Sequence, residues 1–165
     1  MSVLRYVEQF DKLAYNPETG IFTWAVPPSR SAIKAGDVAG SKHSDGYLSI
    51  KYGGKKYFSH RLAWILTYGS WPVGQIDHIN GCRTDNRLEN LRDVSHSVNQ
   101  QNQRTARKNS ISGFLGVCWH KKSKKWVAQI TIDRKVTRLG TFSTADAAHQ
   151  AYVSAKRSAH AGCMI

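Results

Sequence analysis

The chain has 165 residues, of which 41% are apolar, enough for one ordinary domain or two small ones. Its 24 Lys and Arg against 11 Asp and Glu give a net charge of +13, which indicates a polyanionic partner, although a merely soluble basic protein stays open. Three scattered cysteines disfavour a disulfide framework or a cysteine zinc finger, and the lack of any long apolar run disfavours a membrane span or a secretory leader.

The first part of the chain predicts short strands and one buried helix. Residues 15–24 contain a group of turn formers followed by a β-prone run, which predicts a turn leading into a strand. Residues 47–58 alternate around a Gly-Gly pair, as β-hairpins do. The apolar run Arg61–Tyr68 predicts a buried helix that ends at Gly69. His60 should then lie where a strand passes into a helix, a place where a histidine is more often structural than a ligand.

The segment Gln75–Arg92 crowds Asp, Asn and Arg residues around one glycine. Asp77 and His78 would point to opposite faces of a strand, so both can serve one site only if the strand ends there. The Asn-Gly pair that follows supplies such an end. Further on, Ser95 suits the N-cap of a short helix, which would place Asn99 about one turn into that helix.

These residue types suit the hydrolysis of a phosphodiester. That reaction needs a water, a base that takes its proton, and a cation that stabilises charge on the phosphate and on the leaving oxygen. Asp77 offers a carboxylate and Asn99 an amide oxygen, the kind of ligands that Mg²⁺ accepts together with water. Two alternatives are an Asn-rich loop that only satisfies its own backbone, and a structural zinc bound by His60, His78 and Cys82.

Most of the positive charge lies in the last part of the chain. Residues 1–103 hold twelve basic and nine acidic residues, a net +3, whereas residues 104–165 hold twelve basic and two acidic residues, a net +10. Residues 103–113 are polar and basic without apolar periodicity, as flexible linkers are. We therefore expect two modules joined by this segment.

The second module predicts three strands and one helix. Residues 116–142 contain alternating segments separated by basic turns at Lys121–Lys125 and Asp133–Lys135. Ser143 begins a capping-box-like helix start, and small apolar residues then recur at helical spacing until Gly162. The many alanines would let this helix lie close to the sheet.

The runs SHRLAW, IDHINGCRTDNRLENLR and SHSVNQQN resemble the HNH homing-type endonucleases of bacteriophages, whose ββα-metal core is a two-stranded ribbon and a helix around one divalent ion. The resemblance extends over about residues 15–103. It implies five site residues, which are Asp77 and Asn99 as metal ligands, His78 as general base, and His60 and Asn90 as further catalytic positions, Asn90 in a structural role. An Asn stands at the last motif position, where the family name has a His, and this favours Mg²⁺ or Mn²⁺ over a softer ion.

The run GVCWHKKSKKWVAQI, followed by RLGTFSTADAAHQAY, is similar to the plant ERF (Apetala-type) DNA-binding domain, which also occurs behind phage HNH nucleases. That family lays a three-stranded sheet in the major groove of DNA. The expected DNA contacts, one of them in the SHRLAW element, are Arg61, Trp119, Lys121, Lys122, Lys124, Trp126, Arg134 and Arg138. Leu115, Cys118 and His120 stand where the plant domains usually carry arginines, so the plant sequence preference does not transfer. The lysines would hold phosphates, unless they form only a solvated turn.

We therefore expect an α+β protein with an HNH nuclease domain and N-terminal β-hairpins in residues 1–103, a basic linker in 104–112 and an ERF-like DNA-binding domain in 113–165. The expected function is metal-dependent hydrolysis of phosphodiester bonds in double-stranded DNA. A monomer is favoured over an oligomer, and the expected location is the cytoplasm of a bacterial host cell. An inactive DNA-binding regulator and an RNA-binding protein that uses the sheet as an aromatic platform are the alternatives.

Overall fold

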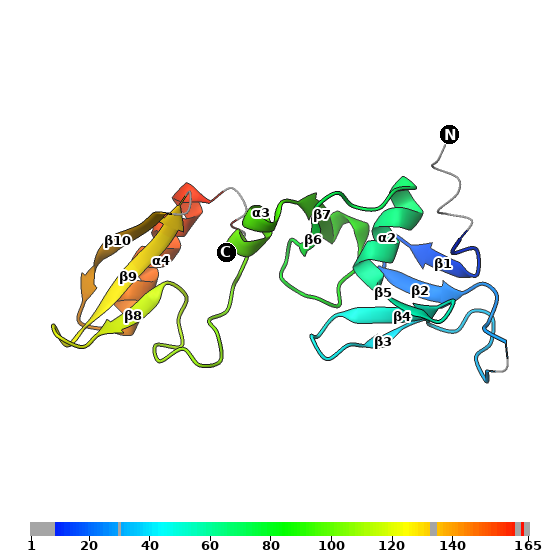
Figure 1. Ribbon diagram of the computed structural model, residues 1–165, viewed down its shortest axis with the longest axis horizontal. Coiled ribbons are helices and arrows are strands. Elements are labelled where there is room, and N and C mark those ends of the chain that lie inside the picture. Colours follow the sequence, from blue (N-terminus) through cyan, green and yellow to red (C-terminus); the bar gives the residue numbers. More distant parts are fainter. Residues whose placement is uncertain (1–8, 30, 133–134, 161–162, 164–165) are drawn as a thin grey trace. The chain divides into compact units, whose positions relative to one another are not determined.

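The computed structural model describes residues 9–29, 31–132, 135–160 and 163. The chain divides into two compact units, Met1–His96 and Ser97–Ile165, and each unit combines small antiparallel sheets or strands with helices (Figure 1). The mixed α+β class predicted from the sequence is thus confirmed. No helix within the described residues is both long enough and apolar enough to cross a membrane.

The first unit contains a β-hairpin and a three-stranded sheet in its N-terminal half. The hairpin is formed by β1 (Leu13–Asn16) and β2 (Ile21–Trp24), and the sheet by β3 (Ser41–Lys42), β4 (Leu48–Tyr52) and β5 (Lys55–Phe58), in the order β3-β4-β5. Gly53 and Gly54 turn the chain between β4 and β5 with φ of 55° and 79°. Two consecutive left-handed residues are what a two-residue type I′ turn needs, so the predicted hairpin is confirmed.

Helix α2 (Ser59–Tyr68) follows β5 without a loop and ends at Gly69, as predicted. Gly69 has φ 70°, and its N–H donates to the carbonyl of Ile65 at 2.8 Å. Leu62 and Ile65 are fully buried in the core of the unit, together with Phe10. The helix begins two residues earlier than the apolar run suggested, so His60 belongs to its first turn and not to the preceding strand.

A second ribbon follows α2 in the chain. Strand β6 (Gln75–His78) pairs antiparallel with β7 (Leu91–Val94), and in this register Asp77 lies opposite Arg92. The intervening loop closes with a short 3-10 turn, η1 (Leu88–Asn90). Ile76 and Leu91 join the core, which anchors both strands. As predicted, the strand that carries Asp77 and His78 ends immediately after them.

Helix α3 (His96–Gln101) begins at the last residue of the first unit and continues into the second unit, which also contains a sheet backed by a helix (Figure 1). The sheet has the order β10-β9-β8, with β8 (Val117–His120), β9 (Lys125–Ile132) and β10 (Lys135–Phe142), and α4 (Ala145–Ala159) packs on it. The predicted three strands and one helix are confirmed. The predicted N-cap was wrong: Thr144 and not Ser143 caps α4, because Thr144 has an extended backbone and its side chain accepts a hydrogen bond from the Ala147 amide at 3.2 Å. The expected helix end, Gly162, lies outside the described residues.

Close packing between α4 and the sheet depends on small residues. Ala128 and Ala148 are fully buried and form the centre of this core with Val117. Gly116 has φ 70°, and a Cβ placed there would lie 1.9 Å from the ring of Tyr152 on α4. Any side chain at Gly116 would therefore have to displace the helix or the ring.

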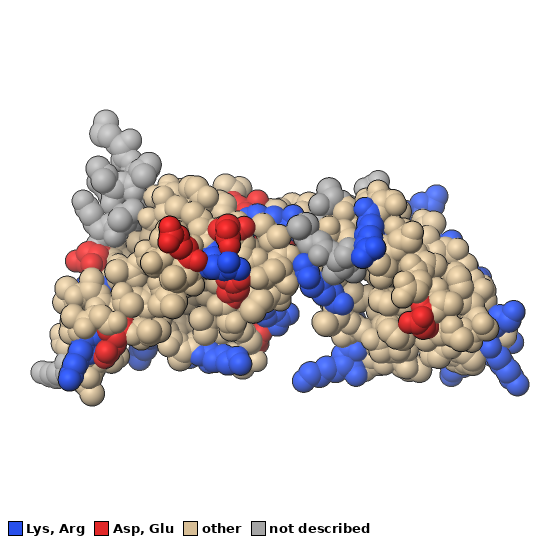
Figure 2. Space-filling view, turned by 180° about the vertical axis from the view of Figure 1, so that it is seen from behind, with Lys and Arg blue, Asp and Glu red and all other residues tan. Residues whose placement is uncertain are grey.

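The charged surface of the second unit is almost entirely basic. Residues 97–165 hold the same twelve basic and two acidic residues as residues 104–165, because no charged residue lies between 97 and 103. Figure 2 shows Lys and Arg dominating the charged side chains on the visible face of this unit, whereas acidic and basic side chains are mixed on the first unit. A surface of this kind attracts a polyanion.

Candidate functional site

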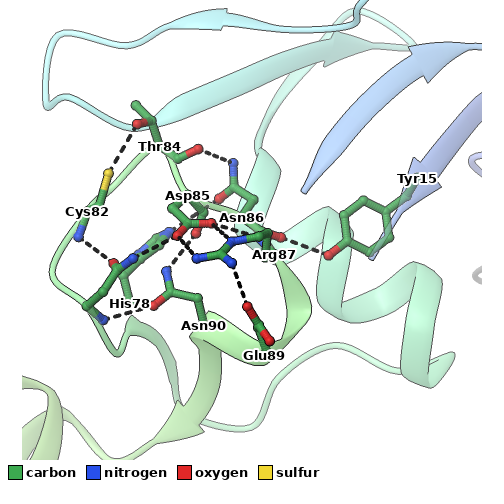
Figure 3. Close-up of polar contacts among 10 residues, drawn as sticks. Tyr15, His78, Cys82, Thr84, Asp85, Asn86, Arg87, Glu89 and Asn90 are labelled. Carbon is green, nitrogen blue, oxygen red and sulfur yellow. Dashed lines mark hydrogen bonds and ion pairs between the residues drawn. The ribbon is translucent and has the colours of Figure 1, made fainter. Parts of the chain in front are cut away.

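The loop between β6 and β7 is held together by its own polar side chains (Figure 3). The Asn90 side chain accepts a hydrogen bond from the Asn80 amide and donates one to the Asp85 carbonyl, both at 2.8 Å. The Asp85 carboxylate binds the guanidinium of Arg87 at 2.8 Å, and hydrogen bonding from Arg87 lowers the pKa of Asp85 to about 2. These contacts explain why Asn, Asp and Arg crowd this segment: they shape the turn that follows Asp77 and His78.

His78 is buried at the end of β6, with 4% of its surface exposed. Its Nε2 lies 3.3 Å from the Asn86 side-chain oxygen, and Asn86 is itself 1% exposed. Because an amide oxygen only accepts hydrogen bonds, this contact selects the tautomer with the proton on Nε2 and the lone pair on Nδ1. Burial lowers the pKa of His78 below the usual value of a histidine, against an opposing effect of the Asn86 contact. The imidazole is therefore neutral near pH 7, as a general base has to be.

His60 lies directly beside His78, a proximity that their separation in the sequence does not reveal. The two rings meet edge to face with centroids 5.1 Å apart. The ring of Phe58 also stacks on the ring of His60, with centroids 5.4 Å apart. Among the described residues, the buried Nδ1 of His60 has no hydrogen-bond partner. Burial, and next the neighbouring His78, lower the pKa of His60 to about 3. His60 is thus a neutral ring that holds one side of His78 in an aromatic pocket, which Tyr47 completes.

Asp77 is held by an ion pair across the ribbon. Its Oδ2 accepts hydrogen bonds from Nε and Nη2 of Arg92, at 2.9 and 2.7 Å, and Asp77 is 5% exposed. Gln75, two residues earlier on β6, has its side-chain oxygen 3.2 Å from Nδ1 of His96, where α3 begins. Residues two apart on a strand share a face, so Asp77, Arg92 and the side chain of His96 belong to one side of the ribbon. His78 is the last residue of β6, where the strand ends, and it contacts Asn86, His60 and Tyr47.

Asn99, the second predicted metal ligand, is half-buried on α3. It belongs to the second compact unit, and its place beside Asp77 stays a prediction. No group of three or more His, Cys, Asp or Glu side chains among the described residues is arranged to hold a metal ion. The oxygen donors of Asp77 and Asn99 nevertheless suit a hard divalent ion, which needs few protein ligands because it keeps several waters.

The lysines predicted to contact DNA are accessible. Lys121, Lys122 and Lys124 lie with Lys125 at the exposed turn between β8 and β9. Lys124 has φ 48°, a left-handed conformation that closes this turn. These four lysines give the turn at this end of the sheet a high density of positive charge.

The predicted aromatic and arginine contacts of the second unit are distributed differently. Trp126 packs against the core beneath α4, and Trp119 meets it edge to face at 4.9 Å while remaining 38% exposed. The strand register places Arg138 opposite Gln129, on the face of the sheet that points away from α4, and its guanidinium contacts Thr141. The DNA contacts of these side chains stay predictions, and Arg134 lies outside the described residues.

In the first unit, Arg61 stands on α2 with its guanidinium 5.5 Å from the ring of Trp71. It is partly buried, so only part of the side chain could reach a phosphate. Cys82, which the zinc alternative required, is exposed, and its sulfur lies 3.4 Å from the Thr84 hydroxyl.

The sequence reasoning did not predict the roles of two residues of the site. Asn86 orients His78, and Arg92 pairs with Asp77. An antiparallel register that puts Asp77 opposite Arg92 would have revealed the second contact, because directly opposed residues on one face touch. No pattern in the sequence distinguishes Asn86 from the other asparagines of the loop, since its contact depends on how the loop folds back.

Comparisons with known proteins concern the segment that carries this site. Residues 57–101, which run from the end of β5 to the end of α3, match the family model of the HNH endonucleases. The HNH domain that the sequence resemblance implied is thereby confirmed for this segment. Protein 3.8 of Escherichia phage T7 is 34% identical over 77 residues, which are 46% of this chain and 63% of the phage protein. The chain thus spans less than two thirds of the length of this relative. No solved structure gives a significant match.

Proposed function

We propose that this protein is a metal-dependent endonuclease that hydrolyses phosphodiester bonds in double-stranded DNA. The observation that carries the proposal is a buried, neutral His78, oriented by Asn86 and adjacent to a carboxylate at the end of a strand, within the segment that matches the HNH endonucleases. A base and a site for a cation at one strand end are the two requirements of this hydrolysis.

His78 acts as the general base. Its Nδ1 takes one proton from a water molecule, the water oxygen attacks phosphorus, and the 3′ oxygen of the broken bond departs. His60 cannot compete for the proton, since its pKa of about 3 leaves it a weak base, and it acts by keeping the ring of His78 in place. Asn90 contributes indirectly, because its two hydrogen bonds hold the loop that follows His78.

Asp77 and Asn99 hold one Mg²⁺ or Mn²⁺ ion. When bound, the ion supplies positive charge to the phosphate oxygens and the departing 3′ oxygen. Support for a role of Asn99 comes from its amide oxygen and from its place 21 residues after His78, within the segment that matches the HNH endonucleases.

The second unit binds the duplex as an ERF-like domain. Its three-stranded sheet with one helix, its net charge of +10 and the exposed Lys121–Lys125 turn support this role. Phosphate contacts of this kind bring affinity and position the protein without reading sequence. An RNA-binding platform is less well supported, because Trp126 is engaged in the core and not displayed on the sheet surface.

Nicking of supercoiled plasmid with and without Mg²⁺ tests the proposal. We expect His78→Ala to reduce cleavage by about 10²–10⁴-fold while leaving duplex affinity unchanged, because a base acts on the water and not on binding. His160→Ala, which removes a histidine of the second unit, is the matched control and should cut normally. A His78→Ala protein that cuts at the wild-type rate would rule out the assigned base. A wild-type protein that nicks equally well without metal would rule out the metal requirement, and one that does not nick in either condition would support the inactive regulator.

A further inference from the structure

Arg92 neutralises a buried carboxylate that the proposed function assigns to a metal ion. Hydrogen bonds from its Nε at 2.9 Å and its Nη2 at 2.7 Å end on the same oxygen of Asp77. The Asp77 side chain is 6% exposed and that of Arg92 is 24% exposed. A buried carboxylate needs a compensating positive charge, and without metal this guanidinium supplies it.

A divalent ion and Arg92 would compete for Asp77. Both are cations attracted by the same carboxylate, and at such short range they repel each other. Asp77 is buried on a strand whose position is set by the register of the ribbon, whereas the side chain of Arg92 is longer and 24% exposed. The arginine is therefore the partner that can move.

We propose that Arg92 is a built-in counter-ion of Asp77 that yields the carboxylate to the metal and then binds a phosphate of the DNA. This inference rests on the proposed function, since it requires metal at Asp77. A guanidinium presents a planar set of donors that suits phosphate oxygens, so DNA stabilises the released arginine. Metal and DNA consequently bind cooperatively, and by reciprocity each tightens the binding of the other by the same factor.

A fixed structural pair, or an arginine that orients Asp77 for the metal, would behave differently. In either case removal of Arg92 leaves metal binding unchanged or weakens it. A competing counter-ion, in contrast, weakens metal binding while it is present, so its removal tightens metal binding. The sign of one measured change therefore separates these roles.

The first measurement is Mn²⁺ affinity of the full chain without DNA, followed by the electron paramagnetic resonance signal of free Mn²⁺. We expect Arg92→Gln to bind Mn²⁺ about fivefold more tightly than the wild type. Arg87→Gln is the matched control, because Arg87 also pairs with a carboxylate, that of Asp85, in the same loop, and its affinity should equal that of the wild type. Unchanged or weaker binding by Arg92→Gln would overturn the proposal. Wild-type affinity in Asp77→Asn would instead show that the metal assignment of the proposed function is wrong.

The second measurement is duplex affinity with and without Mn²⁺, in a His78→Ala background to suppress cleavage. With Arg92 present, Mn²⁺ should tighten duplex binding by about fivefold or more, and with Arg92→Gln this gain should disappear. A gain that persists in Arg92→Gln would refute the release of Arg92 to phosphate. If Arg92→Gln does not fold, Arg92→Met decides: it keeps an unbranched side chain without the charge, so it should also bind Mn²⁺ more tightly than the wild type, and unchanged or weaker binding would overturn the proposal.

Discussion

Because Asn86 contacts His78, a substitution that exchanges one atom of Asn86 should change the pH dependence of cleavage. Asn86→Asp replaces the amide nitrogen by oxygen with little change in shape and places a negative charge 3.3 Å from Nε2 of His78. A nearby carboxylate favours the protonated imidazole and so raises the pKa of His78, opposite to the effect of burial. A protonated His78 has no lone pair for the water proton, so the pH below which the variant loses activity should move upward.

The size of the change follows from the distance. Two unit charges 3.3 Å apart interact by about 5 kcal/mol at an effective dielectric constant of about 20, which sets an upper limit of between three and four pKa units. The new carboxylate is buried where Asn86 is 1% exposed, and burial raises its own pKa and weakens the effect. We therefore expect the pKa of His78 to rise by about one to three units.

Plasmid nicking measured from about pH 5.5 to pH 9, with saturating Mg²⁺, reports this pKa as the acidic limb of the rate profile. A titration of the His78 ring by NMR measures the same group without turnover. Asn86→Ala is the control, because it removes the hydrogen bond without adding charge, and its limb should not move to higher pH. If Asn86→Asp and Asn86→Ala gave the same profile, the reasoning that Asn86 controls the base would be wrong.

Three further predictions concern stability and DNA affinity. The pKa of His60 is about 3 in the folded protein and near 6.5 when unfolded. The stabilising contribution of the neutral ring should therefore be fully present above about pH 6.5, and the free energy of unfolding should fall by up to about 1.4 kcal/mol per pH unit below it. Urea unfolding at several pH values should show a flatter pH dependence for His60→Gln. Gly116→Ala should destabilise the second unit by about 2 kcal/mol or more in thermal unfolding because the new Cβ meets Tyr152, whereas Gly113→Ala, with the same φ of 70° and open space, should cost less. Four lysines form the turn between β8 and β9: Lys121, Lys122, Lys124 and Lys125. Replacing them by Gln should flatten the slope of log duplex affinity against log salt by up to roughly 3.6, and an unchanged slope would exclude phosphate contacts at this turn.

The local elements of this protein could be predicted from the sequence because their causes are local. The paired glycines at 53–54 force the turn of a hairpin, Gly69 ends α2 through its left-handed conformation, and alternation in residues 117–142 predicts the three strands of the second unit. The end of β6 after His78 follows from the Asn-Gly pair in the same way. Each of these features depends on residues within a few positions, so propensity and spacing suffice.

The partners of the site residues were decided only by tertiary structure. Asp77 meets Arg92 through the register of two strands, and His78 meets His60 because α2 and the ribbon share one core. Trp126 is a further example, because its place in a strand was predictable but its burial beneath α4 depends on which face of the sheet the helix covers. Contacts between residues distant in the chain depend on the packing of whole elements, and a side chain carries no local signal of what it will touch. The sequence determined which chemical groups are present, and the fold decided which of them act together.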